Sequence, residues 1–90
     1  MSEINDILTE RGKRYGEYKS TAFISQELKN IMHECPSWDK LTYAQREGLE
    51  MIQHKIARML NGDPAYTDNW VDIIGYATLV LETMDDGTTN

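Results

Sequence analysis

The sequence predicts an all-α protein of four helices, centred on an antiparallel hairpin of the third and fourth helices. Four segments carry apolar residues at the three- and four-residue spacing of an amphipathic helix. No segment alternates polar and apolar residues for long enough to indicate a strand. Both prolines lie between the helical segments, where proline ends or starts a helix.

The amino-terminal part is predicted to form two helices joined by an ordered loop. The first helix covers about residues 3–11, and the glycine-broken segment 11–19 after it is predicted as the loop. The second helix begins at Ser20 or Thr21 and ends at His33, where a Cys-Pro-Ser-Trp segment follows.

The third helix, predicted over Thr42 to Asn61, has the clearest boundaries. Thr42 and Gln45 have the spacing of a capping box, and Asn61-Gly62 followed by a proline is a stop signal. At about 100° per residue, one side of this helix is apolar and the other polar. The apolar side holds Leu49, Ile52, Ile56, Met59 and Leu60, and the polar side holds Glu47, Glu50, His54, Arg58 and Asn61.

The fourth helix is predicted to begin at Thr67 or Asp68 and to continue toward Met84. Its apolar residues extend nearly all the way round, which is typical of a helix buried on most sides. We therefore expect the rest of the fold and a second subunit to cover it. Residues 1–85 are predicted to form one domain, and residues 86–90 a polar tail that frays.

The composition excludes several classes of protein. A chain of 90 residues buries only about 60–65% of its unfolded surface, so we expect a homodimer or higher homo-oligomer. The single cysteine allows neither an internal disulfide nor a zinc knuckle. A net charge of −6 argues against stable nucleic-acid binding, and neither a signal peptide nor a membrane span is evident. These observations predict a cytoplasmic protein.

Asp72 is unusual because it lies within the apolar fourth helix, where a carboxylate needs a partner. One interpretation is a structural pair with a lysine or arginine of a neighbouring helix, or with a helix terminus. The other is a metal site shared with Glu47 and Glu50, which lie at i, i+3 on the third helix. Convergent carboxylates suit Mg²⁺ or Mn²⁺, although a Glu-x-x-Glu is more often part of a solvated helix face.

Basic and aromatic residues indicate a second kind of site, for phosphate. His54, Lys55 and Arg58 lie on the third helix, where they can bind phosphate or pair with acids. Segment 11–19 combines glycines, cations and tyrosines, which suit close backbone approach, phosphate attraction and base stacking. The candidate binding residues of this segment are Arg11, Lys13, Arg14, Tyr15 and Tyr18. The alternative interpretation of the segment is a solvated turn.

Three segments resemble small phage and prophage proteins that are mostly catalogued as a domain of unknown function. They are QREGLEMIQHKIARMLNGDP at 45–64, DNWVDIIGYA at 68–77 and the tyrosine-glycine segment RYGEY at 14–18. The resemblance covers about residues 11–81. More distantly, the Lys-x-x-Arg of the third helix and the Asp-x-x-x-Asp-x-x-x-Tyr that ends at Tyr76 are similar to phage domains associated with nucleotide modification.

The predicted hairpin also resembles the all-α nucleoside triphosphate pyrophosphohydrolases, the MazG-like superfamily. That superfamily carries Glu-x-x-Glu and Glu-x-x-Asp on successive helices, binds Mg²⁺ and releases a monophosphate and pyrophosphate. The resemblance implies that Glu47, Glu50 and Asp72 are catalytic carboxylates that hold the metal, with Asp68 assisting. Asn69 stands where the superfamily has its third acid.

The sequence leaves three functions open. The first is binding of a nucleotide or nucleotide-derived phosphate in a phage context, extended in its enzymatic form to Mg²⁺-dependent hydrolysis of a nucleoside triphosphate. In that form Lys55, Arg58, His54, Tyr76 and segment 11–19 contact the substrate. The second is non-catalytic sequestration of a nucleotide or nucleotide signal as an anti-defence protein. The third is an acidic helical inhibitor or adaptor of another protein.

Overall fold

The computed structural model describes residues 2–85, and for Ser2 and Asp85 the backbone alone. Its α-helices are α1 (Ser2–Tyr15), α2 (Tyr18–Glu34), α3 (Tyr43–Asn61) and α4 (Thr67–Asp85), and a 3₁₀ turn, η1 (Pro36–Lys40), joins α2 to α3. Within these residues there is no strand, so the predicted all-α class with four helices is confirmed. The predicted tail, 86–90, lies outside the described residues.

The predicted loop over residues 11–19 is wrong in extent, because α1 continues to Tyr15 and α2 already begins at Tyr18. An ion pair between Arg14 and Glu10, one turn apart, supports the extra helical turn. The connection is reduced to Gly16 and Glu17. Gly16 has φ 77°, the left-handed backbone that favours glycine, and its N–H closes α1 by donating to the Gly12 carbonyl.

The predicted start of α3 is confirmed at the level of its hydrogen bonds. The Thr42 hydroxyl accepts from the Gln45 N–H, and the Gln45 side chain accepts from the Thr42 N–H. This capping box satisfies two backbone donors at the helix start. The helix ends at Asn61, with Gly62 as its C-cap, as the Asn-Gly-Asp-Pro pattern predicts.

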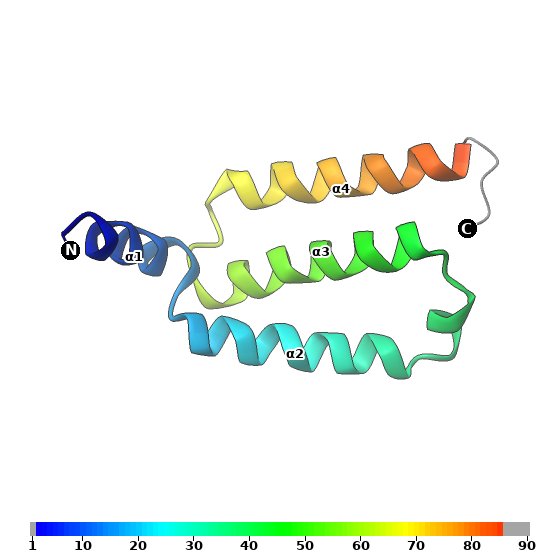
Figure 1. Cartoon of the computed structure of the whole chain (residues 1–90), viewed down its shortest axis with the longest axis horizontal. Helices are drawn as coiled ribbons and strands as arrows, with labels where there is room; N and C mark the ends of the chain where they lie inside the picture. Colours follow the sequence, from blue (N-terminus) through cyan, green and yellow to red (C-terminus); the bar gives the residue numbers. More distant parts are fainter. Residues whose placement is uncertain (1, 86–90) are drawn as a thin grey trace.

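Helix α3 lies in the middle of a layer of three helices, with α2 on one side and α4 on the other (Figure 1). Ser25 of α2 and Gln53 of α3 exchange hydrogen bonds between their buried side chains. On the other side, the absence of a side chain at Gly48 lets Val80 of α4 come so close that a Cβ would lie 2.3 Å from its Cγ2. Helix α1 projects from the end of this layer where α2 begins and α3 ends (Figure 1).

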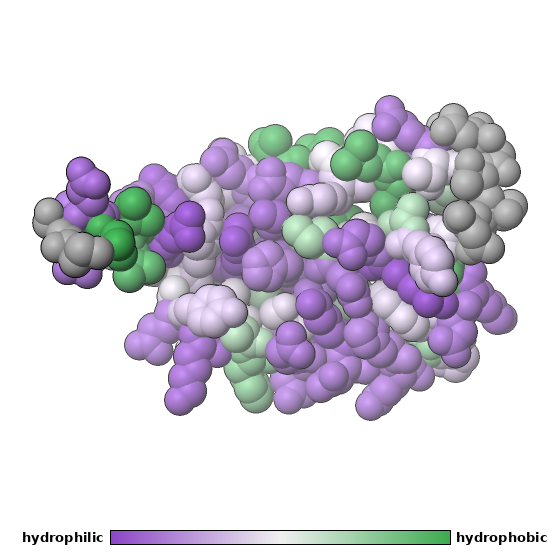
Figure 2. All heavy atoms as spheres, in the orientation of Figure 1, coloured by the Kyte–Doolittle hydropathy of each residue, from purple (hydrophilic) through white to green (hydrophobic). Residues whose placement is uncertain are grey.

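A single layer encloses little core. Among the described residues, Ala57 is the one hydrophobic residue that is buried, and five polar or charged residues are buried beside it: Thr21, Ser25, Gln53, Lys55 and Asn69. Apolar residues remain at the surface along α4 and on α1, whereas the face of α2 and α3 seen in Figure 2 is mostly hydrophilic. Over residues 2–85, the helices lack the combination of length and apolarity needed to cross a bilayer.

Candidate anion-binding site

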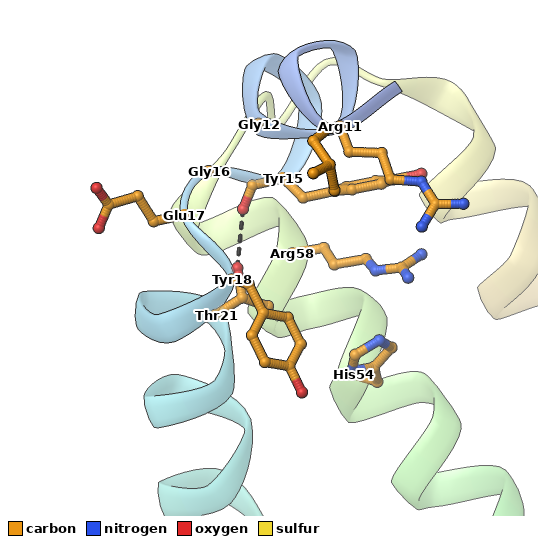
Figure 3. Close-up of a pocket in the computed structure, with 10 residues that line it drawn as sticks. Arg11, Gly12, Tyr15, Gly16, Glu17, Tyr18, Thr21, His54 and Arg58 are labelled. Carbon is orange, nitrogen blue, oxygen red and sulfur yellow. Dashed lines mark hydrogen bonds between the residues drawn. The ribbon is translucent and has the colours of Figure 1, made fainter. Parts of the chain in front are cut away.

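The α1–α2 connection is tied to the carboxyl end of α3 by Asn61. Its amide Nδ2 donates to the carbonyls of Tyr15 and Glu17, at 3.2 and 3.1 Å, and to the Thr21 hydroxyl at 2.9 Å. The Thr21 hydroxyl in turn donates to the Tyr15 carbonyl (Figure 3). These bonds satisfy carbonyls at the end of α1 and fix the direction in which α1 leaves the layer.

Two glycines allow this contact between backbones. A Cβ at Gly16 would lie 2.1 Å from the Asn61 carbonyl oxygen, and a Cβ at Gly62 would lie 2.1 Å from the Arg14 carbonyl oxygen. The N–H of Asp63 also donates to that Arg14 carbonyl, at 2.7 Å. The junction therefore requires glycine at both positions. The sequence indicates close backbone approach for the glycines of segment 11–19 and a helix stop at Gly62, but not that the two segments contact each other.

A cavity of about 530 Å³ opens beside this junction, between the end of α1, the start of α2 and the polar side of α3. Figure 3 shows its lining residues, which are Leu8, Arg11, Gly12, Tyr15, Gly16, Glu17, Tyr18, Thr21, His54 and Arg58. Five of them are predicted binding residues: Arg11, Tyr15, Tyr18, His54 and Arg58. The structure thus brings two separate parts of the sequence prediction together.

The cations of the cavity lie on one side of it. The guanidinium of Arg58 stacks over the Tyr15 ring at 4.3 Å from its centroid, and the Arg11 side chain extends in the same direction (Figure 3). Among the described side chains, neither arginine pairs with a carboxylate. Stacking on an aromatic face holds a guanidinium in place while it leaves its N–H donors available to an anion.

His54 lies one turn before Arg58 on the same side of α3. Burial, followed by the charges of Arg58, Lys55 and Lys29, lowers the pKa of His54 from its ordinary value of 6.5. An anion in the cavity would oppose these cations and raise the pKa. His54 is therefore neutral near pH 7 in the free protein and becomes easier to protonate when an anion binds.

We expect His54 to make the free protein less stable as pH falls. Its folded-state pKa lies below the unfolded value, so the unfolded state binds more protons and stability is lost as pH falls through about 6.5. Thermal melts between pH 7.5 and 5.5 should show that the melting temperature of the wild type falls more steeply with pH than that of His54→Gln. The other histidine, His33, is present in both proteins, so its titration does not contribute to the difference. Equal pH slopes for the two proteins would contradict this assignment.

The other predicted phosphate-binding residues do not line the cavity. Arg14 pairs with Glu10 and stacks over the Tyr66 ring at 4.2 Å, and Lys13 is exposed. Tyr76 lines a different groove, between α3 and α4. Lys55 points to the opposite side of α3 from α2 and pairs with Asp72 of α4.

The predicted metal-binding carboxylates are directed to different partners. Glu50 contacts His33 of α2 at 2.6 Å, Asp72 contacts Lys55 at 3.0 Å, and Asp68 accepts from the Tyr66 hydroxyl at 2.8 Å. Glu47 is exposed beside the groove that holds Tyr76. Over residues 2–85, no three His, Cys, Asp or Glu residues gather into a group that could hold a metal ion. Within one chain, these carboxylates therefore do not fit the Mg²⁺ site that the superfamily resemblance implies.

The pair formed by Asp72 matches the structural interpretation of that residue. The Lys55 side chain is only 9% exposed, whereas that of Asp72 is 46% exposed, so the pair keeps a nearly buried ammonium neutralised. We expect Asp72→Asn to lower stability by about 2 kcal/mol, because the substitution leaves the buried charge without its counter-ion. Urea unfolding should show this loss. Asp68→Asn, an exposed change one turn earlier on the same helix, is the control, and an equal effect of both substitutions would contradict the role of the pair.

Asn69, at the position of the superfamily's third acid, is not available to a ligand from solvent. It is only 1% exposed, and among the described residues its Nδ2 has no hydrogen-bond partner. Sequence reasoning also missed Thr21, which lines the cavity, and Asn61, which holds the α1–α2 connection beside it. An asparagine before a glycine indicates a helix end, but no sequence signal gives its contact with a segment more than forty residues away.

Comparison with known proteins gives one match. The model of a domain of unknown function, DUF6378, matches residues 1–84. No curated protein and no solved structure is significantly similar to the chain. The match confirms the predicted resemblance to a domain of unknown function, while the phage and MazG-like resemblances stay predictions. Since the match extends over nearly the whole sequence, the chain belongs to the DUF6378 family.

Proposed function

We propose that this protein binds a phosphate-bearing small molecule of the nucleotide type in the cavity between α1, α2 and α3. The observation that carries the proposal is the pair of guanidinium groups, Arg11 and Arg58, that extend side by side without a carboxylate partner among the described residues (Figure 3). In a chain of net charge −6, most of the surface repels anions. Two adjacent free guanidinium groups therefore favour an anion at this one place, because planar N–H pairs match phosphate oxygens.

The size and the aromatic residues of the cavity support a ligand larger than phosphate alone. A volume of about 530 Å³ is within the range of small-molecule sites. Tyr15 is already stacked by Arg58, so the exposed Tyr18 ring is the aromatic face open to a base. Leu8 adds an apolar wall. A nucleotide uses all three features, with its phosphates on the arginines and its base on the tyrosine.

Binding without turnover is favoured over hydrolysis. The carboxylates that the pyrophosphohydrolase resemblance implies lie outside the cavity and contact His33, Lys55 and Tyr66. His54 and Glu17 are the cavity residues suited to proton transfer. The cations around His54 lower its pKa, and the Glu17 side chain is directed away from the two arginines (Figure 3). The arrangement therefore supports sequestration of a nucleotide or nucleotide signal, with Mg²⁺-dependent hydrolysis as the alternative that the same experiment tests.

Thermal shift with a ligand panel tests the proposal. The panel contains phosphate, pyrophosphate and nucleoside mono-, di- and triphosphates, with and without Mg²⁺, and released pyrophosphate is assayed in parallel. At 100 times its dissociation constant a ligand should stabilise the protein by about 2.7 kcal/mol. Stabilisation without product supports sequestration, and Mg²⁺-dependent pyrophosphate release supports the hydrolase instead. No stabilisation by any phosphate compound would overturn the proposal.

A further inference from the structure

A broad apolar surface extends along α4 and the adjoining side of α3, and we call it the α4 surface. Its exposed members are Trp70, Val71, Ile74, Leu81 and Met84 of α4, with Leu49, Ile56 and Leu60 of α3. A groove between the two helices, lined by Leu49, Ile52, Leu81 and Met84, shows that apolar residues of both helices face the same side. Figure 2 shows apolar residues along part of α4.

The α4 surface is separate from the anion-binding cavity. Ile56 lies two residues from both His54 and Arg58, which places it about 200° around α3 from each of them. One side of α3 therefore lines the cavity, and the opposite side contributes to the α4 surface. A partner on the α4 surface leaves the cavity open.

The accessible area of the chain is larger than that of a compact monomer, which leaves room for a partner on this surface. The chain exposes 6606 Å², whereas a compact monomer of its mass exposes about 5,400 Å². The excess of about 1,200 Å² exceeds the roughly 800 Å² that each partner contributes to a stable interface of standard size. Part of the excess comes from the projecting α1, and the exposed apolar residues of α4 contribute to it as well.

The charge distribution favours a second copy as the occupant. Two chains of net charge −6 repel each other wherever acidic faces meet. Between Asn69 and Leu81, however, α4 has one charged residue, Asp72, and that carboxylate is directed to Lys55 of α3. Two copies of an uncharged surface can pack against each other without like-charge contacts. Each protomer is a single layer of helices, and two layers packed on these faces form a bundle that encloses a core. We propose that the α4 surface is the interface of a symmetric homodimer.

Sedimentation analysis of the full chain at micromolar concentration tests this proposal. The wild type should sediment at twice the 10.4 kDa chain mass, and Ile74→Glu should sediment as a monomer. Phe23→Glu is the matched control, because Phe23 and Ile74 are both 66% exposed and Phe23 lies on α2, on the far side of α3. It should remain dimeric. A wild type that is monomeric at all concentrations, or a dimer that Phe23→Glu disrupts and Ile74→Glu does not, would overturn the proposal.

A second measurement avoids the risk that Ile74→Glu fails to fold. In Trp38→Phe, Trp70 of the α4 surface is the one remaining tryptophan. Its emission should shift to longer wavelength on dilution, at the concentrations where sedimentation shows dissociation, because the half-exposed ring then meets water. An emission maximum that is constant while the dimer dissociates would place the interface elsewhere and overturn the proposal.

Discussion

Gly16→Ala should lower the stability of the protein by about 3 kcal/mol or more. An alanine at φ 77° costs about 1–2 kcal/mol on backbone grounds. Its Cβ would also lie 2.1 Å from the Asn61 carbonyl and 2.5 Å from the Asn61 amide. The α1–α2 connection must then move away from α3, and the hydrogen bonds from the Asn61 amide are lost, each worth about 1 kcal/mol. For a domain of this size we expect the melting temperature to fall by more than about 10 °C.

Gly12→Ala is the matched control for this substitution. Gly12 lies four residues earlier, within helix α1, and a Cβ added there meets nothing within 4 Å. Alanine is better than glycine inside a helix by about 0.5–1 kcal/mol, so this variant should be slightly more stable than the wild type. Calorimetry should show a lower melting temperature for Gly16→Ala and an equal or slightly higher one for Gly12→Ala. Equal effects would mean that the junction between α1 and α3 does not form as described.

Arg58→Gln should weaken binding of a phosphate-bearing ligand by about 10- to 100-fold. A hydrogen bond between a charged group and its partner contributes about 1.5–3 kcal/mol, and a glutamine retains a polar side chain but neither the charge nor the paired N–H donors. The same change removes the guanidinium that stacks over Tyr15. Titration calorimetry with the best ligand of the panel gives the dissociation constants.

Lys13→Gln is the control for the loss of a positive charge. Lys13 belongs to the same basic segment of the sequence as Arg11 but is exposed outside the cavity. At physiological ionic strength an exposed charge is largely screened beyond about 8 Å, so this variant should bind about as well as the wild type. If Lys13→Gln weakens binding as much as Arg58→Gln does, the ligand is attracted by the basic segment as a whole and does not occupy the cavity.

The sequence predicts the helices of this protein well where their signals are local. The capping box of Thr42 and Gln45 and the Asn-Gly stop give both ends of α3, because these hydrogen bonds form between residues close in the chain. The extent of α1 is not predicted correctly. Gly12 suggests a break, yet a single glycine is tolerated within a helix that an Arg14–Glu10 pair supports.

The sequence predicts the types of residue in the candidate site, but it predicts only in part which residues line the cavity. Arg11, Tyr15, Tyr18, His54 and Arg58 meet in one cavity, whereas Lys13 and Tyr76 are candidates of the same kind that lie elsewhere. Helical periodicity gives the side of α3 on which a residue lies but not the helix that faces that side. Glu50 is therefore predicted as a metal ligand but contacts His33, because α2 packs on that flank of α3.

An NMR titration of the labelled protein with a nucleoside triphosphate tests the central claim most directly. Amide and side-chain signals show at once whether a ligand binds and which residues it contacts. We predict that the signals of Arg11, Tyr15, His54 and Arg58 shift together and saturate, and that the pKa of His54 rises in the bound state. Shifts confined to Glu47, Asp72 and Tyr76, or no saturable shifts with any member of the panel, would contradict the account.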